Sequence, residues 1–200
     1  MKRIAVFADT HHSFKWLPLA AERLGKVDLL FHLGDFAIDA EQVAQALGGV
    51  PYVTVRGNND SGSVYPKQRI ERVEDIWMLL VHGDSYYTTG QLAERARDNR
   101  CAAVLFGHTH EPLLAASGKV LLLNPGSLSL PRHGYAPSFA VLEVEGKEYF
   151  IDLLLFHRRL RCLVAVELKI GEFQPEFVGK MQFYLAALDL SSSKETVLEV

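Results

Sequence analysis

Cysteine and long uncharged apolar runs are both scarce in this chain of 200 residues. The two cysteines, Cys101 and Cys162, lie far apart beside apolar residues, so we expect buried free thiols rather than a disulfide framework. No stretch approaches the ~18 apolar residues that a membrane span requires, and Asp9 interrupts the first apolar run before a signal sequence develops. These absences predict a soluble, cytoplasmic protein with no membrane partner.

The chain also lacks a surplus of positive charge. Its 21 Lys and Arg residues against 24 Asp and Glu residues give a formal net charge of -3. Such a balance supplies no large attractive field for nucleic acid, so a nucleic-acid partner is not indicated by charge and any phosphate binding must be local. The 48% of hydrophobic residues suffices for one principal domain with an appendage.

Apolar runs that end in polar clusters recur along the first half of the chain. Each run is typical of a buried strand, and residues 16–24, 39–47 and a segment from Thr88 have helical patterns between them. Asp39 with Gln42 and Thr88 with Gln91 resemble capping boxes. The alternation predicts an α/β fold in which all five clusters share one rim. The five runs are residues 3–8, 27–33, 50–55, 76–81 and 102–106.

Histidine and aspartate dominate these clusters. Two histidines separated by one residue, His108 and His110, directly follow a buried run and could turn into one cavity, although an exposed loop is the alternative. Asp9 and His11 could equally be a helix cap and a surface histidine, and Asp35 an ordinary turn residue. Mixed oxygen and nitrogen ligands suit manganese, iron, nickel or zinc better than calcium or magnesium alone.

The ordered motifs resemble those of the calcineurin-like metallophosphoesterase superfamily, in particular its small bacterial and archaeal phosphodiesterases. The resemblance covers residues 1 to about 147. It rests on Asp9-Thr10-His11, Gly34-Asp35, Gly57-Asn58-Asn59-Asp60, His82-Gly83 and Gly107-His108-Thr109-His110, together with the turn Asn124-Pro125-Gly126-Ser127.

The resemblance implies two divalent ions, of which Mn²⁺ is the first candidate and Ni²⁺, Fe²⁺, Zn²⁺ or Mg²⁺ the others. Asp35 would bridge the two ions, and a bridging hydroxide would attack the phosphodiester. Asp35, Asn58 and His108 are the implied catalytic residues. The implied ligands of one ion are Asp9, His11, Asp35 and His110, and those of the other are Asp35, Asn58, His82 and His108.

Two further residues are candidates for substrate contact, Arg56 and Asn59. Arg56 could bind phosphate, although a structural ion pair is an equal alternative. Many members of the superfamily have a histidine where this chain has Asn59, and asparagine cannot act as a general acid. Asp84 likewise stands where a further histidine is common. His32, inside an apolar run, is more typical of a core histidine than of a ligand.

The residues from about 148 onward resemble part of a nuclease family with an Asp and Glu-any-Lys signature, here Asp152, Glu167 and Lys169. Strands at 149–156 and 162–168 and a helix at 177–188 are expected, and self-association into a homo-oligomer is expected if their apolar surface is open. Alternatively, residues 149–156 form the terminal strand of the phosphoesterase sheet. We divide the chain into a phosphoesterase domain, 1–147, and a partial nuclease-like segment, 148–200.

We therefore expect a four-layer α/β/β/α metallophosphoesterase sandwich followed by an α+β nuclease-like fragment. The expected function is metal-dependent phosphodiester hydrolysis of a small diester or nucleotide. The alternatives are a non-catalytic metal-binding scaffold and a nuclease that acts through the C-terminal segment.

Overall fold

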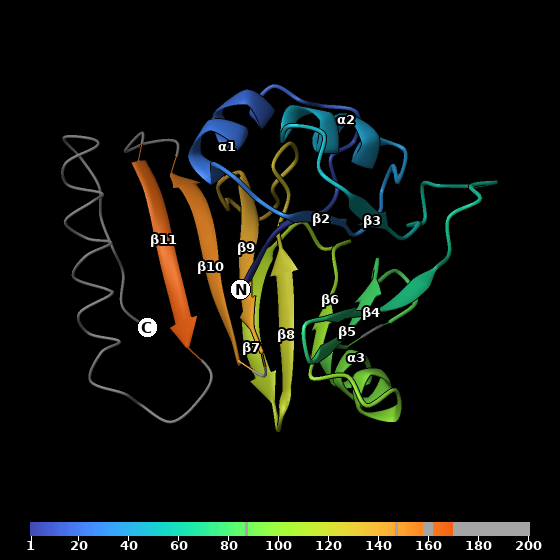
Figure 1. Cartoon of the computed structure of the whole chain (residues 1–200). Helices are drawn as coiled ribbons and strands as arrows, with labels where there is room; N and C mark the ends of the chain where they lie inside the picture. The colour runs from blue at the N-terminus through green and yellow to red at the C-terminus, as the bar shows by residue number, and fades with distance from the viewer. Residues whose placement is uncertain (87, 147, 158–161, 170–200) are drawn as a thin grey trace.

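A computed structural model describes residues 1–86, 88–146, 148–157 and 162–169. In the last two ranges only the strand pairing is described. The chain forms two sheets that face each other, with helices against their outer surfaces (Figure 1). This is the mixed α/β architecture that the sequence predicts. The expected helix at 177–188 lies outside the described residues.

The first sheet has the order β11-β10-β9-β1-β2-β3. Its central strand β1 pairs in parallel with β2 and antiparallel with β9. The bounds are β1 Lys2–Phe7, β2 Leu29–His32, β3 Tyr52–Thr54, β9 Ser138–Glu145, β10 Glu148–His157 and β11 Cys162–Lys169.

The second sheet has the order β4-β5-β6-β8-β7. Its strands β5, β6 and β8 are parallel to one another, and β4 and β7 close the two edges antiparallel to their neighbours. The bounds are β4 Gln68–Val73, β5 Ile76–Val81, β6 Ala103–Leu105, β7 Pro112–Ser117 and β8 Val120–Pro125.

Three hydrophobic clusters separate four layers. In β1, Ile4 and Val6 join the cluster between the two sheets, whereas Phe7 joins the cluster under helices α1 (Leu17–Leu24) and α2 (Asp39–Ala46). In β5, Leu79 contributes to the third cluster, against helix α3 (Thr89–Asp98). Because successive side chains of a strand point to opposite faces, one apolar run serves two layers.

Two local predictions differ from the structure. The start of α2 is not a capping box, because Ile38 is its N-cap residue and, within the described residues, no side chain caps it. The Asp39 carboxylate is bonded instead to Thr10 and His12. The edge strands β4 and β7 were not predicted. By contrast, Thr88 and Gln91 form the expected capping box at α3.

The strand pairing continues past residue 147. Strand β10 pairs antiparallel with β9, and β11 pairs antiparallel with β10 (Figure 1). The alternative in which residues 149–156 extend the phosphoesterase sheet therefore matches the structure. Cys101 is a buried free thiol, as expected. Among the described residues, no helix is both long enough and apolar enough to cross a membrane.

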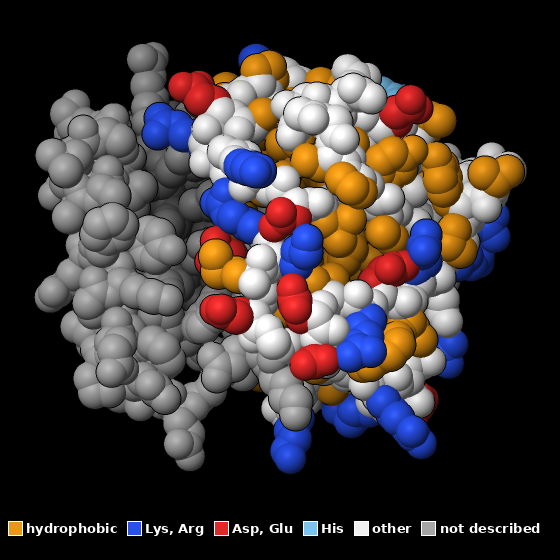
Figure 2. Space-filling model, in the orientation of Figure 1, with side chains coloured by type: hydrophobic (Ala, Val, Ile, Leu, Met, Phe, Trp, Pro, Cys, Tyr) orange, Lys and Arg blue, Asp and Glu red, His pale blue; other side chains and the backbone are white. Residues whose placement is uncertain are grey.

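The surface in Figure 2 has acidic and basic side chains intermixed rather than a field of one sign. Hydrophobic side chains gather toward the upper right of that view, where Figure 1 shows α2, β2 and β3. The mixture of both signs on this face agrees with the formal net charge of -3.

Candidate metal centre

The seven predicted ligands come from loops that follow five strands of two different sheets. Strands β1, β2 and β3 lead into Asp9 and His11, Asp35, and Asn58, whereas β5 and β6 lead into His82 and into His108 and His110. The sequence predicts one shared rim, and the structure forms it where the strand ends of the two facing sheets meet.

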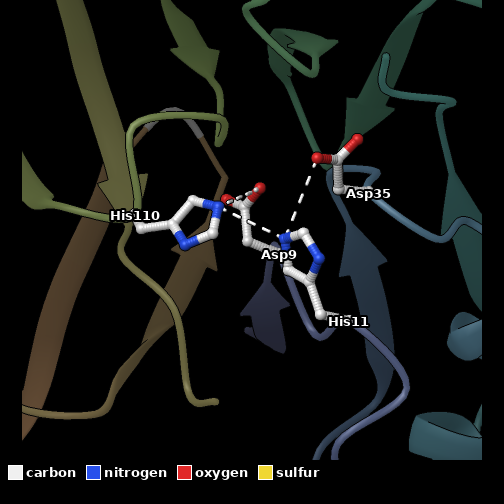
Figure 3. A group of neighbouring side chains, drawn as sticks. All are labelled: Asp9, His11, Asp35 and His110. Carbon is white, nitrogen blue, oxygen red and sulfur yellow. Dashed lines mark hydrogen bonds and ion pairs between the residues drawn. The ribbon is translucent and has the colours of Figure 1, made fainter. Parts of the chain in front are cut away.

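One half of the centre consists of Asp9, His11, Asp35 and His110. One ligand atom from each of the four lies within 4.8 Å of the others. The imidazole rings of His11 and His110 are tilted to each other by 47° and approach through their Nε2 atoms, which lie 3.3 Å apart, and Asp9 lies between the loops that carry them (Figure 3). His110 Nε2 is 3.4 Å from Asp9 Oδ1, and His11 Nε2 is 3.8 Å from Asp35 Oδ2.

The other half is arranged around His82, whose side chain is fully buried. Its Nε2 atom lies 3.2 Å from the amide oxygen of Asn58 and 3.3 Å from Asp35 Oδ1. The ring of His108 stands edge-on to that of His82 with centroids 5.2 Å apart. Asp35 therefore takes part in both halves, through one carboxylate oxygen in each.

The tautomers of two histidines suit this cluster to binding a cation. His82 Nδ1 donates to the Leu33 carbonyl at 2.8 Å, and His110 Nδ1 donates to the Leu130 carbonyl at 2.6 Å. In the neutral ring, Nε2 then carries a lone pair that faces carboxylate oxygens. The buried Asp9 Oδ1 has no hydrogen-bond partner among the described residues. Imidazole lone pairs that face an unpartnered, buried carboxylate oxygen form a set of ligands that suits a divalent metal ion.

The pKa shifts of His82, His110 and Asp35 reflect the negative charge of the two carboxylates and the hydrogen bonds around them. Burial opposes charge on His82, but the hydrogen bond to Asp35 and the nearby carboxylates outweigh it and raise the pKa of this imidazole. Burial lowers the pKa of His110, but the nearby negative charge of Asp9 outweighs this effect and raises it. Burial alone would raise the pKa of Asp35. The hydrogen bonds from His82 and Asn59 together have a larger, opposite effect and bring this pKa below its ordinary value. The nearby carboxylates thus favour positive charge on both imidazoles.

Backbone conformation adds a signal that the sequence does not show. Five of the seven predicted ligand residues have positive φ angles, which non-glycine residues seldom adopt. Such conformations cost about 1–3 kcal/mol each and cluster at functional sites. The angles are +53° at Asp9, +48° at His11, +48° at Asp35, +69° at His108 and +62° at His110.

Two glycines let the ligand loops approach one another. A Cβ atom on Gly57 would lie 2.2 Å from Asp35 Oδ1, and one on Gly107 would lie 2.8 Å from Asp9 Oδ2. Both distances are shorter than a nonbonded contact allows. Glycine is therefore required at both positions by packing against the carboxylates of Asp35 and Asp9.

The Asp60 carboxylate connects two of the loops that carry predicted ligands. Its carboxylate oxygens accept hydrogen bonds from the backbone N–H groups of Ala37 and Gly57, each at 2.7 Å. These bonds link the loop of Asp35 to the loop of Asn58. The sequence motif that contains Asp60 gives its position but not this role.

The turn of residues 124–127 supports the centre from the second sheet. Ser127 Oγ donates to the carbonyl of Asp9 at 2.8 Å, and Asn124 Nδ2 donates to the carbonyl of Gly107 at 2.9 Å. Both bonds are buried. The turn thus fixes the backbone beside ligands from β1 and from β6.

The two predicted substrate contacts, Asn59 and Arg56, have different surroundings. Asn59 donates from its backbone N–H and its Nδ2 group to the two oxygens of Asp35, at 3.1 and 2.7 Å, so it orients that carboxylate. Arg56 Nη1 donates to the Ser63 carbonyl at 3.3 Å, and its buried Nε has no partner within the described ranges. Contact of either residue with substrate stays a prediction.

A buried network behind the ligand loop was not predicted. Asp39 accepts bonds from Thr10 Oγ1 at 2.7 Å and from His12 N at 2.8 Å, and its other oxygen lies 2.6 Å from His12 Nδ1. His32 Nε2 lies 3.1 Å from Thr10 Oγ1, and burial lowers the pKa of His32 to about 4. His32 is therefore a core histidine, as its apolar context suggests.

The nuclease-like residues lie on the two added strands. Asp152 of β10 is the direct cross-strand partner of Glu167 of β11, and Phe150 is the partner of Lys169. The two acidic residues are therefore on adjacent strands, as predicted. Their side chains lie outside the described part of the chain, and their role stays a prediction.

Comparison with known proteins identifies the family. The family model described as "Calcineurin-like phosphoesterase superfamily domain" matches residues 1–147. A protein of Methanocaldococcus jannaschii named "Probable metallophosphoesterase" is 32% identical over 135 residues, 64% of this chain and 69% of that protein. The chain belongs to the calcineurin-like phosphoesterase superfamily.

Two further relatives carry the same likeness. Phosphodiesterase YfcE of Escherichia coli is 29% identical over 113 residues, 51% of this chain and 59% of that protein. The crystal structure of a conserved phosphoesterase-like protein of Streptococcus pneumoniae TIGR4 matches with a TM-score of 0.65 and 26% identity, over 84% of this chain and 98% of that one.

The end of the chain resembles a different family. The model described as "YhcG PDDEXK nuclease domain" matches residues 134–197. The nuclease-like protein YhcG of Escherichia coli K12 is 48% identical over 44 residues, which are 22% of this chain and 12% of that protein. The chain thus spans a small part of the length of YhcG.

Proposed function

We propose that this protein hydrolyses phosphodiesters at a centre of two divalent metal ions. The observation that carries the proposal is the buried set of lone pairs around Asp9 and Asp35, toward which His110 and His82 direct their Nε2 atoms. Family membership supports the same conclusion. Asp9, His11, Asp35 and His110 would hold one ion, and Asp35, Asn58, His82 and His108 the other.

Bound Mn²⁺ ions, or Ni²⁺, Fe²⁺, Zn²⁺ or Mg²⁺, would supply Lewis acidity that activates water and stabilises charge on the leaving oxygen. The protein holds the proposed metal ligands in fixed orientations. Asn59 keeps both oxygens of Asp35 in place, and the carbonyls of Leu33 and Leu130 fix the tautomers of His82 and His110. Since Asn59 cannot donate a proton as an acid, diesters with good leaving groups should react fastest.

The test is hydrolysis of bis-p-nitrophenyl phosphate by metal-stripped protein to which Mn²⁺ is restored. We expect turnover in the parent and a loss of at least ~100-fold in Asp35→Asn, because one ligand of both ions loses its charge. Asp98→Asn, an exposed change at the end of α3, is the matched control and should keep parent activity. Bound metal is counted in all three proteins.

Two outcomes would refute the proposal. Two bound ions without turnover would favour a metal-binding scaffold. Turnover of DNA that survives Asp35→Asn and is lost in Lys169→Ala would favour the nuclease, a second candidate supported by the match of residues 134–197 and by the pairing of Asp152 with Glu167.

A further inference from the structure

The imidazole of His11 differs from those of His82 and His110 in how its orientation is fixed. In His82 and His110 the ring nitrogen that does not face the centre, Nδ1, donates to a backbone carbonyl. Histidines that bind metals usually have such a bond, because it sets the tautomer and the direction of the ring. Among the described residues, the Nδ1 atom of His11 forms no hydrogen bond, and its Nε2 atom lies near His110 and Asp35. A different contact must therefore hold this ring in place.

Phe36 makes that contact from outside the set of proposed ligands. Its ring centroid lies 5.4 Å from that of His11 at an interplanar angle of 74°, which is an edge-to-face arrangement. The Phe36 ring also contacts that of His12, with centroids 4.0 Å apart. The His12 ring is itself anchored, because its Nδ1 atom lies 2.6 Å from Asp39 Oδ1. Phe36 thus joins a ring that Asp39 anchors to a ring that faces the metal centre.

The backbone of Phe36 has an unusual conformation for a bulky residue. Its φ angle is +46°, directly after Asp35 at +48°. Glycine adopts such angles without strain, whereas other residues seldom do. The Phe36 carbonyl accepts a hydrogen bond from Asp39 N at 2.9 Å, which links this conformation to the start of α2. A phenyl ring at a position where glycine would be less strained indicates that the ring itself has a role.

Resting on the metal centre proposed above, we infer that Phe36 is a positioning residue for the ion that His11 would hold. Its ring takes the place of the missing Nδ1 hydrogen bond and keeps His11 Nε2 directed toward Asp35. Edge-to-face ring contacts are favourable beyond the burial of apolar surface. The effect is confined to one ion, because within the described ranges no ring contact joins Phe36 to His82 or His108.

The first test is calorimetric titration of metal-stripped protein with Mn²⁺. Phe36→Leu keeps an apolar side chain but removes the ring, so we expect the Kd of one ion to rise about 10-fold and that of the other to stay unchanged. Phe36→Tyr keeps the ring and should bind both ions as the parent does. Trp77→Leu removes a half-exposed ring at the opposite end of β5 from His82, and this matched control should also bind both ions normally.

A double-mutant cycle then separates orientation of His11 from a general effect on the fold. In His11→Ala there is no imidazole to orient, so adding Phe36→Leu should weaken Mn²⁺ binding no further. In His108→Ala, which alters the other half of the centre, Phe36→Leu should still raise the Kd of the ion held by His11 about 10-fold.

Three results would overturn the inference alone. Parent-like Kd values for both ions in Phe36→Leu would show that the ring does not act on the centre. An equal loss at both sites would place the effect at the neighbouring Asp35. A further 10-fold loss in the His11→Ala background would make Phe36 a support of the fold rather than of His11. Absence of Mn²⁺ binding by the parent would refute the metal centre and the role of Phe36 together, whereas two bound ions without turnover would refute only the phosphodiesterase function.

Discussion

Buried His32 should make the metal-free protein less stable in mild acid. Its side chain is inaccessible to solvent, its Nε2 bonds to Thr10, and its Nδ1 has no hydrogen-bond partner in the described part of the chain. A proton on Nδ1 would therefore be both buried and unpaired. Burial is the main cause of the lowered pKa of about 4, which the charges of Asp39, Asp9 and Asp60 oppose.

The sign and size of the effect follow from linkage. Above pH 6.5, the ordinary pKa, His32 is neutral in both the folded and the unfolded state. Between pH 6.5 and about 4 the unfolded chain binds a proton that the folded chain does not, so stability falls as the pH falls. At about pH 5, roughly 1.5 units below the unfolded-state pKa, the loss is about 2 kcal/mol at 1.36 kcal/mol per unit.

The assay is urea unfolding of metal-free parent and His32→Gln at about pH 7 and pH 5. Glutamine keeps an N–H donor for Thr10 but does not titrate, and other titrating groups contribute to both proteins. The free energy of unfolding should fall by about 2 kcal/mol more in the parent than in the variant between the two pH values. Equal changes, or a larger fall in the variant, would refute this account of His32.

Three other perturbations have defined outcomes. Gly107→Ala would press a methyl group against Asp9 Oδ2, so it should lower the free energy of unfolding by about 1–3 kcal/mol and weaken Mn²⁺ binding. The control Gly90→Ala in α3 should have neither effect. Parent-like Mn²⁺ binding by Gly107→Ala in a calorimeter would contradict this. Asp39→Asn should weaken Mn²⁺ binding about 10-fold, because Thr10 and His12, on either side of His11, lose their charged hydrogen-bond acceptor. An unchanged Kd for Mn²⁺ would show that Asp39 does not position the loop that carries His11. Mn²⁺ at about 100 times its Kd should stabilise the metal-free protein by about 2.7 kcal/mol per site, read as a rise in Tm, and no rise would mean that the centre does not bind the ion.

Much of the fold could be predicted because apolar runs and polar clusters alternate along the first 110 residues. The runs predict buried strands, and the rim at their carboxyl ends predicts where Asp9, Asp35 and His82 meet. Edge strand β4 was missed because its sequence, with Arg69, Glu71 and Arg72, has the polarity of a loop. Its strand character comes from pairing with β5, a tertiary effect.

The gathering of these side chains at one rim could be predicted, but the contacts that hold them there could not. Asp39 has the sequence context of a helix cap, and only the folded chain shows that its carboxylate faces Thr10 and His12. The positive φ angles of Asp9 and His110 and the orphaned Asp9 Oδ1 likewise depend on loops from both sheets. Local sequence patterns determine which residues lie at the rim, and long-range contacts determine how each side chain is oriented.

The strand order has a consequence for the order in which the protein is made. All seven proposed ligands precede residue 111, yet β1 needs β9 as a neighbour and β6 needs β8, and both of these strands come later. A chain still emerging from the ribosome can therefore carry every ligand without the two sheets that bring them together. We therefore expect tight metal binding at the proposed centre only after β8 and β9 have joined their sheets.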